Sequence, residues 1–198
     1  MYNKRAMSAC RLIEGDCMPE LVVFAHDAFP AALHWQAISF MRIVWPYIDA
    51  GLPNETYSAD LSPVHFALVE GSFLLSYAAV TKHTIAQRGT EYRVYGLGNV
   101  LTYPASRHQG FGGQVIAAAD RYIDRSDADV SALFCTAELE PFYARYGWRR
   151  AAETFITSAS NEKMTPLDEL RMMRFISEKG LAGRQQFMSD PLHIRDIW

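Results

Sequence analysis

The spacing of apolar residues predicts one long helix in the first quarter of the chain. Residues 30–46, PAALHWQAISFMRIVWP, carry a proline at each end, where a helix can begin and where it must stop. Between the prolines, apolar side chains recur at helical spacing at Leu33, Ala37, Phe40, Met41 and Val44. This pattern predicts an amphipathic helix.

Three β-prone runs follow a loop. Residues 51–63, GLPNETYSADLSP, have loop composition and enough length to border a substrate. The runs themselves are VHFALVE at 64–70, FLLSYAAVTKHTI at 73–85 and YRVYGLGNVLTY at 92–103. Gly71-Ser72 and Arg88-Gly89 separate them as turns, so an antiparallel meander is predicted.

The second half of the chain alternates helical and β-prone segments. We expect a helix at 113–124, a strand at 129–135, a short helix at 139–147, and strands at 148–158 and 170–177. Residues 160–169 are polar and predict a turn, and the last eighteen residues have no clear period. The order predicts a partly parallel sheet covered by helices, in a single α/β domain that spans residues 1–198.

Composition excludes several function classes. The chain has 198 residues, 49% of them hydrophobic, and a formal net charge of -3, which provides no electrostatic footprint for nucleic acid. No apolar stretch is long enough to span a bilayer. The three cysteines lack CxxC spacing and the six histidines lack metal-ligand spacing. We therefore expect a cytoplasmic chain with reduced thiols, no metal, no nucleic-acid partner and no membrane contact.

A glycine cluster at a strand-to-helix junction is the strongest local motif. Arg107 to Gly112 fit R-x-x-G-x-G, and Gly113 extends the cluster just where a helix is predicted to begin. Glycines let a ligand approach the backbone, and the first helical turn presents unpaired N–H groups to an anion. A phosphate group fits both features, and a tight turn without a ligand is the alternative. No G-K-[ST] follows, which excludes a Walker loop, and the glycine spacing is wrong for a dinucleotide fingerprint.

A second motif, FYARYGW at 142–148, lies about thirty residues further on. The pair P-x-x-R-x-x-G-x-G-helix and F-Y-x-x-x-G-W, in this order across residues 64–157, resembles the GNAT superfamily of acetyl-CoA-dependent N-acetyltransferases. The resemblance implies a GNAT-like mixed, largely antiparallel sheet with flanking helices. It also implies that acetyl-CoA is the co-substrate and that the glycine cluster binds its pyrophosphate.

The resemblance assigns roles residue by residue. The strand NVLTYP is expected to pair with the pantetheine arm, with the N–H of Asn99 or Val100 directed at the thioester carbonyl. Tyr143 is the expected general acid, because a phenol of reference pKa about 10 stays protonated at neutral pH. The expected coenzyme-binding residues are Val100, Leu101, Thr102, Arg107, His108, Gln109, Gly110, Phe111, Gly112 and Gly113.

Each of these roles has a plain alternative. Tyr143 could be a packed aromatic beside Phe142 and Tyr146, and Arg107 a solvated loop arginine. Cys135 lies in an apolar strand near the expected meeting point of the substrates, where a small buried hydrophobe is the more common role.

A closer resemblance is to the aminoglycoside 2'-N-acetyltransferase branch, whose chains also end in an acidic residue, an aliphatic residue and tryptophan. It implies that the terminal carboxylate of Trp198 reaches the acceptor. Two features depart from this branch, because Gly98 stands where its glutamate would be and its acidic loop has no clear counterpart. Asp49, Glu55 and Asp60 are the nearest acidic candidates, and a solvated side chain is the expected state of each.

The sequence thus predicts acetyl transfer to a primary amine of a small molecule, with a polyamine sugar as one candidate acceptor. A protein or peptide amine as acceptor, or an acyl-CoA sensor without turnover, are the alternatives. A homodimer is left open.

Overall fold

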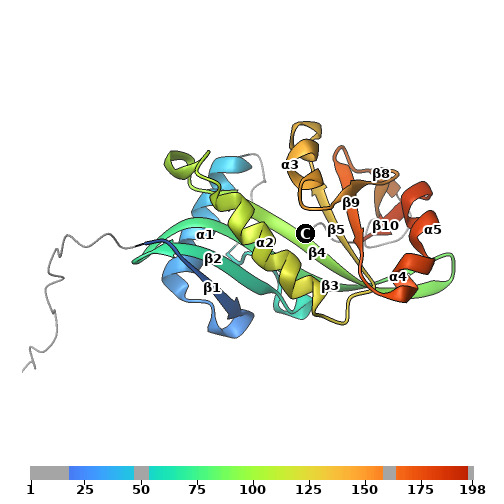
Figure 1. Ribbon diagram of the computed structural model, residues 1–198, viewed down its shortest axis with the longest axis horizontal. Coiled ribbons are helices and arrows are strands. Elements are labelled where there is room, and N and C mark those ends of the chain that lie inside the picture. Colours follow the sequence, from blue (N-terminus) through green and yellow to red (C-terminus); the bar gives the residue numbers. More distant parts are fainter. Residues whose placement is uncertain (1–17, 47–53, 158–163, 196–198) are drawn as a thin grey trace, which may run out of the picture.

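A seven-stranded sheet in the order β1-β2-β3-β4-β5-β9-β6 organises the computed structural model, which describes residues 18–46, 54–157 and 164–195 (Figure 1). A separate three-stranded sheet has the order β10-β7-β8. The strands of the large sheet are β1 (Glu20–Ala25), β2 (Val64–Glu70), β3 (Phe73–Gln87), β4 (Thr90–Thr102), β5 (Val130–Cys135), β6 (Arg149–Arg150) and β9 (Leu170–Phe175).

The predicted meander is confirmed as β2, β3 and β4, which pair antiparallel in sequence order. The β3–β4 hairpin closes through Arg88 and Gly89, whose φ angles of 47° and 78° are both positive. Two left-handed residues match the twist of the flanking strands, which is why this two-residue turn holds the register Gln87 to Thr90. Strand β1 pairs antiparallel with β2 and forms one edge of the large sheet.

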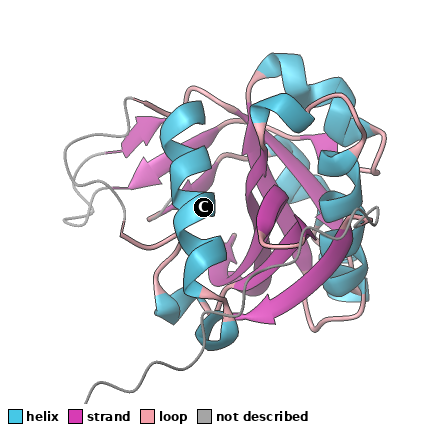
Figure 2. Ribbon diagram, turned by 90° about the vertical axis from the view of Figure 1, so that its left-hand side faces the viewer, coloured by secondary structure: helices cyan, strands magenta, loops and turns pink. Residues whose placement is uncertain are grey.

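Helices cover both faces of the large sheet (Figure 2). On one face, α1 (Ala31–Val44) packs its buried residues against Tyr77, Ala79 and Leu101 in one hydrophobic cluster. On the other face, α2 (Phe111–Asp124) and α3 (Glu140–Ala144) pack in a second cluster, where alanines at 118 and 119 let α2 lie close to the strands. The predicted mixed α/β fold, with a largely antiparallel sheet and flanking helices, is confirmed.

The last third of the chain differs from the prediction. The segment 148–158 is not one strand, because β6 belongs to the large sheet and β7 (Thr154–Thr157) to the small one. The predicted polar turn contains β8 (Met164–Pro166), which pairs with β7. The segment without period contains the end of α4 (Glu178–Ala182) and all of α5 (Arg184–Ser189) and β10 (Leu192–Ile194). Strand β10 lies parallel to β7. These elements are too short for periodicity to reveal them.

Among the described residues, no helix has the length and apolar character needed to cross a bilayer.

Candidate active site

The strands β4 and β5 are the only parallel neighbours in the described part of the large sheet, and they separate soon after they meet. Their register runs from Val94–Val130 to Gly96–Ala132, while β4 continues to Thr102 and β5 to Cys135. Figure 1 shows the two ribbons diverging above this point. Beyond Gly96, the edge of β4 that faces β5 therefore has backbone groups without a partner strand. We call this divergence the β4–β5 opening.

A β-bulge in β4 lies at this opening. Tyr77 pairs with Leu101 and Ala79 with Gly98, so Asn99 and Val100 together oppose the single residue Ala78. Asn99 is left-handed, with φ 48°, and its side-chain Nδ2 donates to the Thr56 carbonyl oxygen at 3.2 Å. A bulge redirects backbone groups out of the ladder. The structure thus places an irregular main chain at the residues predicted to meet the thioester.

The glycine cluster forms the turn into α2, as predicted, but its glycines are required for different reasons. Gly110 is the N-cap of α2 with φ 79°, and His108 before it has φ 64°. At Gly113, a Cβ atom would collide with the Tyr146 hydroxyl. At Gly112, a Cβ atom would lie 3.4 Å from Thr102 Oγ1, a tight contact with a side chain. Backbone conformation and packing therefore explain Gly110 and Gly113 without a ligand.

The other predicted coenzyme residues surround this turn. Arg107 is exposed and its Nε donates to the Thr102 carbonyl oxygen at 3.4 Å, so it contacts the end of β4. His108 and Gln109 are exposed, whereas Val100 and Phe111 are partly buried against the second hydrophobic cluster. The Leu101 side chain is buried in the first cluster, so only its backbone is available to contact a ligand.

Tyr143 lies on α3, which follows β5 across the opening from β4. Its side chain is 6% exposed and its ring packs edge-on against Phe142 with centroids 5.2 Å apart. Burial, Cys135 and Glu169 all raise the pKa of the Tyr143 hydroxyl above its ordinary value. The residue is both packed and firmly protonated at neutral pH, which is the state that a general acid needs.

Cys135 ends β5 as a buried thiol. Burial, followed by the charges of Glu169 and Glu140, raises its pKa to about 11. A thiol in this environment carries almost no thiolate at neutral pH, which favours the interpretation of Cys135 as a small buried hydrophobe.

The structure adds two residues that the sequence analysis did not single out. Glu169 is partly buried beside the end of β5, and burial and Asp168 raise the pKa of its carboxyl. Tyr57 is 8% exposed, and its buried hydroxyl has no hydrogen-bond partner among the residues that the structure describes. Leaving a buried hydroxyl unpaired costs about 1–3 kcal/mol. No short motif marks either residue, since each acquires its neighbours only through the fold.

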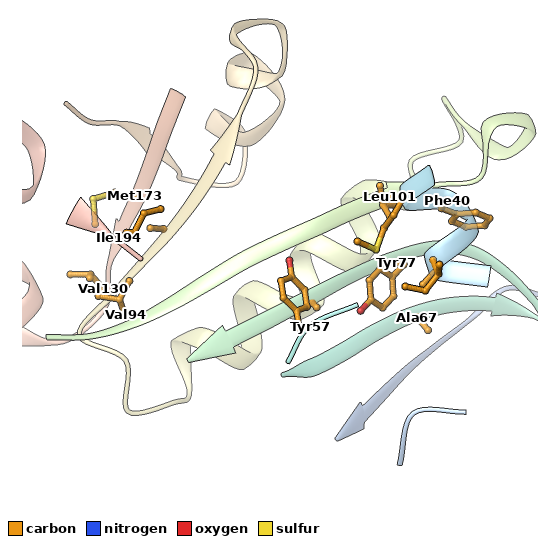
Figure 3. Packing of buried hydrophobic residues seen from close by; sticks show 14 of the residues in the cluster. Phe40, Tyr57, Ala67, Tyr77, Val94, Leu101, Val130, Met173 and Ile194 are labelled. Atoms are coloured by element: carbon orange, nitrogen blue, oxygen red, sulfur yellow. The ribbon is translucent and has the colours of Figure 1, made fainter. Parts of the chain in front are cut away.

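Tyr57 contrasts with the adjacent Tyr77. In the view of Figure 3 their rings lie beside one another, with the Tyr57 hydroxyl turned toward β4 and the Tyr77 hydroxyl turned away from it. The Tyr77 hydroxyl is 2.7 Å from Nδ1 of the buried His65, whose Nε2 is 3.2 Å from His26 Nδ1. Burial, then Tyr77 and Tyr143, raise the pKa of Tyr57 well above its ordinary value. Tyr57 belongs to the first hydrophobic cluster, and its segment is tied to the bulge where the Thr56 carbonyl accepts from the Asn99 side chain.

The remaining candidates are the acidic residues near the first helix and the last residue. Glu55 and Asp60 are exposed, and Asp60 accepts a hydrogen bond from the Ser58 hydroxyl. Asp49 and Trp198 lie outside the described residues. Within the described ranges, no three His, Cys, Asp or Glu side chains gather as metal ligands would.

Comparison with known proteins agrees with this geometry. A family model described as an acetyltransferase (GNAT) domain matches residues 53–151, half of the chain. No curated protein sequence matches significantly.

Solved structures with the same fold cover most of the chain. An acyl-CoA N-acyltransferase from Pseudomonas aeruginosa is 18% identical, with a TM-score of 0.55, over 79% of this chain and 99% of that one. ElaA from Escherichia coli is 15% identical, with a TM-score of 0.58, over 78% and 99%. An aminoglycoside 6'-N-acetyltransferase complexed with coenzyme A is 12% identical, with a TM-score of 0.57, over 79% and 97%. At these identities the likeness concerns the fold, and the predicted 2'-N-acetyltransferase branch gains no support from the 6' enzyme.

Proposed function

Because the chain belongs to the GNAT acetyltransferase family, whose fold supports acyl transfer from an acyl-coenzyme A to an amine, we propose that it acetylates a primary amine of a small molecule. Acetyl-CoA is the proposed acetyl donor. The observation that carries this proposal is the β4–β5 opening with its bulge at Asn99 and Val100.

The coenzyme would lie along the open edge of β4. Its pyrophosphate would meet the first turn of α2, where unpaired N–H groups and the helix dipole favour an anion. Gly112 is the glycine whose missing side chain is best explained by this ligand, since it has an ordinary φ and its Cβ would meet only side chains. Arg107, His108 and Gln109 are exposed beside the same turn, within reach of a phosphate.

The bulge would supply the oxyanion contact. A backbone N–H of Asn99 or Val100 that has left the ladder can donate to the thioester carbonyl as it becomes tetrahedral. Contacts of this class are worth about 100- to 1000-fold in rate. Tyr143, held protonated across the opening, would then give its proton to the departing thiolate.

A cationic acceptor fits the charges near Tyr143. Glu169 and Glu140 both act on Cys135, and Glu169 acts on Tyr143 as well. A polyamine sugar is one acceptor of this kind, and the resemblance of the sequence to the aminoglycoside 2'-N-acetyltransferase branch is the further reason to propose it.

An acceptor panel tests the function directly. We expect acetyl-CoA to bind in calorimetry and to release free thiol with at least one of kanamycin, spermidine, lysine and a short peptide. Turnover of the peptide alone would redirect the proposal to a protein acceptor. Binding without thiol release from any amine would instead identify a sensor and overturn the proposed transfer.

A further inference from the structure

Acetyl transfer to an amine requires a group that removes the amine's proton, and the proposed roles above leave this group unassigned. The structure offers one carboxylate in the right place. Glu169 immediately precedes Leu170, the first residue of β9, which pairs with Cys135 at the end of β5. After Cys135 the chain continues into α3, which carries Tyr143. Glu169 therefore lies on the same wall of the β4–β5 opening as Tyr143.

The charges around Glu169 leave it without a counter-ion. Asp168 is its neighbour in the same turn, Cys135 faces it from β5, and Glu140 and Tyr143 belong to α3. Arg150 lies 3.7 Å from Glu140 and compensates that carboxylate. Within the described ranges no Lys, Arg or His is paired with Glu169. A carboxylate that is partly buried, partly accessible and unpaired is suited to a cationic ligand.

An independent observation points to a polar ligand on the β4 side of the opening. Among the residues that the structure describes, the buried Tyr57 hydroxyl has no hydrogen-bond partner. It belongs to the segment that the Asn99 side chain ties to the bulge through the Thr56 carbonyl. The Tyr57 hydroxyl is thus available for a hydrogen bond to a polar group of a ligand.

We propose, resting on the acetyl transfer inferred above, that Glu169 is the catalytic base that binds the acceptor ammonium and takes its proton. The Glu169 carboxylate accepts one proton from the ammonium group, and the neutral nitrogen attacks the thioester carbon. The new N–C bond forms as the C–S bond breaks, and the thiolate takes the proton of Tyr143. The amide nitrogen then gives its second proton to the Tyr143 oxygen, which restores the phenol, and Glu169 releases the first proton to solvent. The products are the acetylated amine and free coenzyme A thiol, with one proton released overall.

The test compares Glu169→Gln with Asp168→Asn, which removes the same charge one residue away on an exposed side chain. The substrate is the best aliphatic amine of the panel, and kcat/KM is measured by thiol release from pH 6 upward. Glu169→Gln should lower kcat/KM by about 100-fold at pH 7. The loss should shrink as the pH approaches the pKa of the amine, because the acceptor then arrives neutral and needs no base. Asp168→Asn should stay close to the unsubstituted protein at every pH.

Three further measurements separate a base from a structural role. Acetyl-CoA affinity and the melting temperature should be unchanged in Glu169→Gln, and Glu169→Asp, which keeps a carboxylate, should recover part of the rate. A loss that is constant across pH, or an equal loss in Asp168→Asn, would overturn the role of Glu169 while the transfer itself stands. If the unsubstituted protein turns over no amine at all, the proposed function fails, and the role of Glu169 fails with it.

Discussion

The two walls of the β4–β5 opening are built on different chemical principles. The β4 wall presents backbone, because its bulge and open edge are set by strand pairing and by the φ angle of one residue, Asn99. The opposite wall presents side chains, with Tyr143 on α3 and Glu169 before β9. The backbone wall can tolerate side-chain changes that keep its geometry. The side-chain wall can be disabled by the removal of single atoms.

The electrostatic environment differs in the same way. On the side-chain wall, burial and neighbouring acids raise the pKa values of Cys135 and Tyr143, so both groups remain protonated. On the backbone wall, the electrostatic potential arises from fixed N–H dipoles, which do not titrate. The pH dependence of the reaction should therefore arise from the side-chain wall and from the acceptor amine. Because the pKa of Tyr143 is raised, its deprotonation should not limit activity at mildly alkaline pH.

The sharpest contrast between the walls is expected from Tyr143→Phe. Loss of the general-acid hydroxyl should lower kcat by about 100- to 10,000-fold, provided that chemistry is rate-limiting. Acetyl-CoA affinity, measured by calorimetry, should barely change. Tyr146→Phe is the matched control, since it removes a hydroxyl from the same motif and should leave kcat nearly unchanged. Equal kcat values for the two variants would return Tyr143 to a purely packing role.

A second substitution tests whether the backbone wall leads to an anion site. Gly112→Glu should weaken acetyl-CoA binding by at least about 100-fold, since a like charge placed against a phosphate costs several kcal/mol. Gly112→Ala is the control, because its Cβ would only contact the Thr102 and Phe142 side chains. Circular dichroism verifies the fold of both. Retained affinity in a folded Gly112→Glu protein would contradict the pyrophosphate site.

The last residue offers a smaller test of the charge on the acceptor side. A Gly-Ser extension after Trp198 replaces the terminal carboxylate with an amide and keeps the indole. If the carboxylate meets a cationic acceptor, its KM should rise roughly fivefold, the size of one exposed ion pair of about 1 kcal/mol. The same tag placed before Met1 serves as the control. Equal KM values would remove the expected role of the terminal carboxylate and weaken the case for a polyamine sugar.

The smallest effect on rate should come from the backbone wall itself. Asn99→Gly keeps access to positive φ, so kcat/KM should change little although the bond to Thr56 is lost. Asn99→Ala should be less stable than Asn99→Gly by about 1 kcal/mol, because alanine is strained at positive φ. Urea unfolding measures this difference. A large rate loss in Asn99→Gly would mean that the amide side chain itself takes part.

Long elements of this fold could be predicted from the sequence because their patterns are long. The α1 helix and the β2–β4 meander repeat apolar residues over many positions, and the turns between strands carry glycine. By contrast, β6 has two residues and β10 has three, and both depend on partners distant in the sequence. Their pairing is decided by tertiary contacts that no local pattern encodes.

The same distinction between local pattern and tertiary contact applies to the candidate site. Its motifs could be found because glycines and Tyr143 stand at fixed spacing over a short stretch. Glu169 and Tyr57 could not, because each is an ordinary residue of its type until the fold sets it beside Tyr143. The acidic residues near the first helix are different, because their loop composition already indicated solvated side chains. Glu55 and Asp60 are indeed exposed.

The contact between Gly113 and the Tyr146 hydroxyl has an evolutionary consequence. One residue belongs to the first motif and the other to the second, yet each occupies the space that the other would need. A side chain at 113 can be accepted only if 146 gives up its hydroxyl or moves, so a double substitution such as Gly113→Ala with Tyr146→Phe should be better tolerated than Gly113→Ala alone. The two motifs should therefore change together in lineages that descend from this chain, whatever ligand each of them serves.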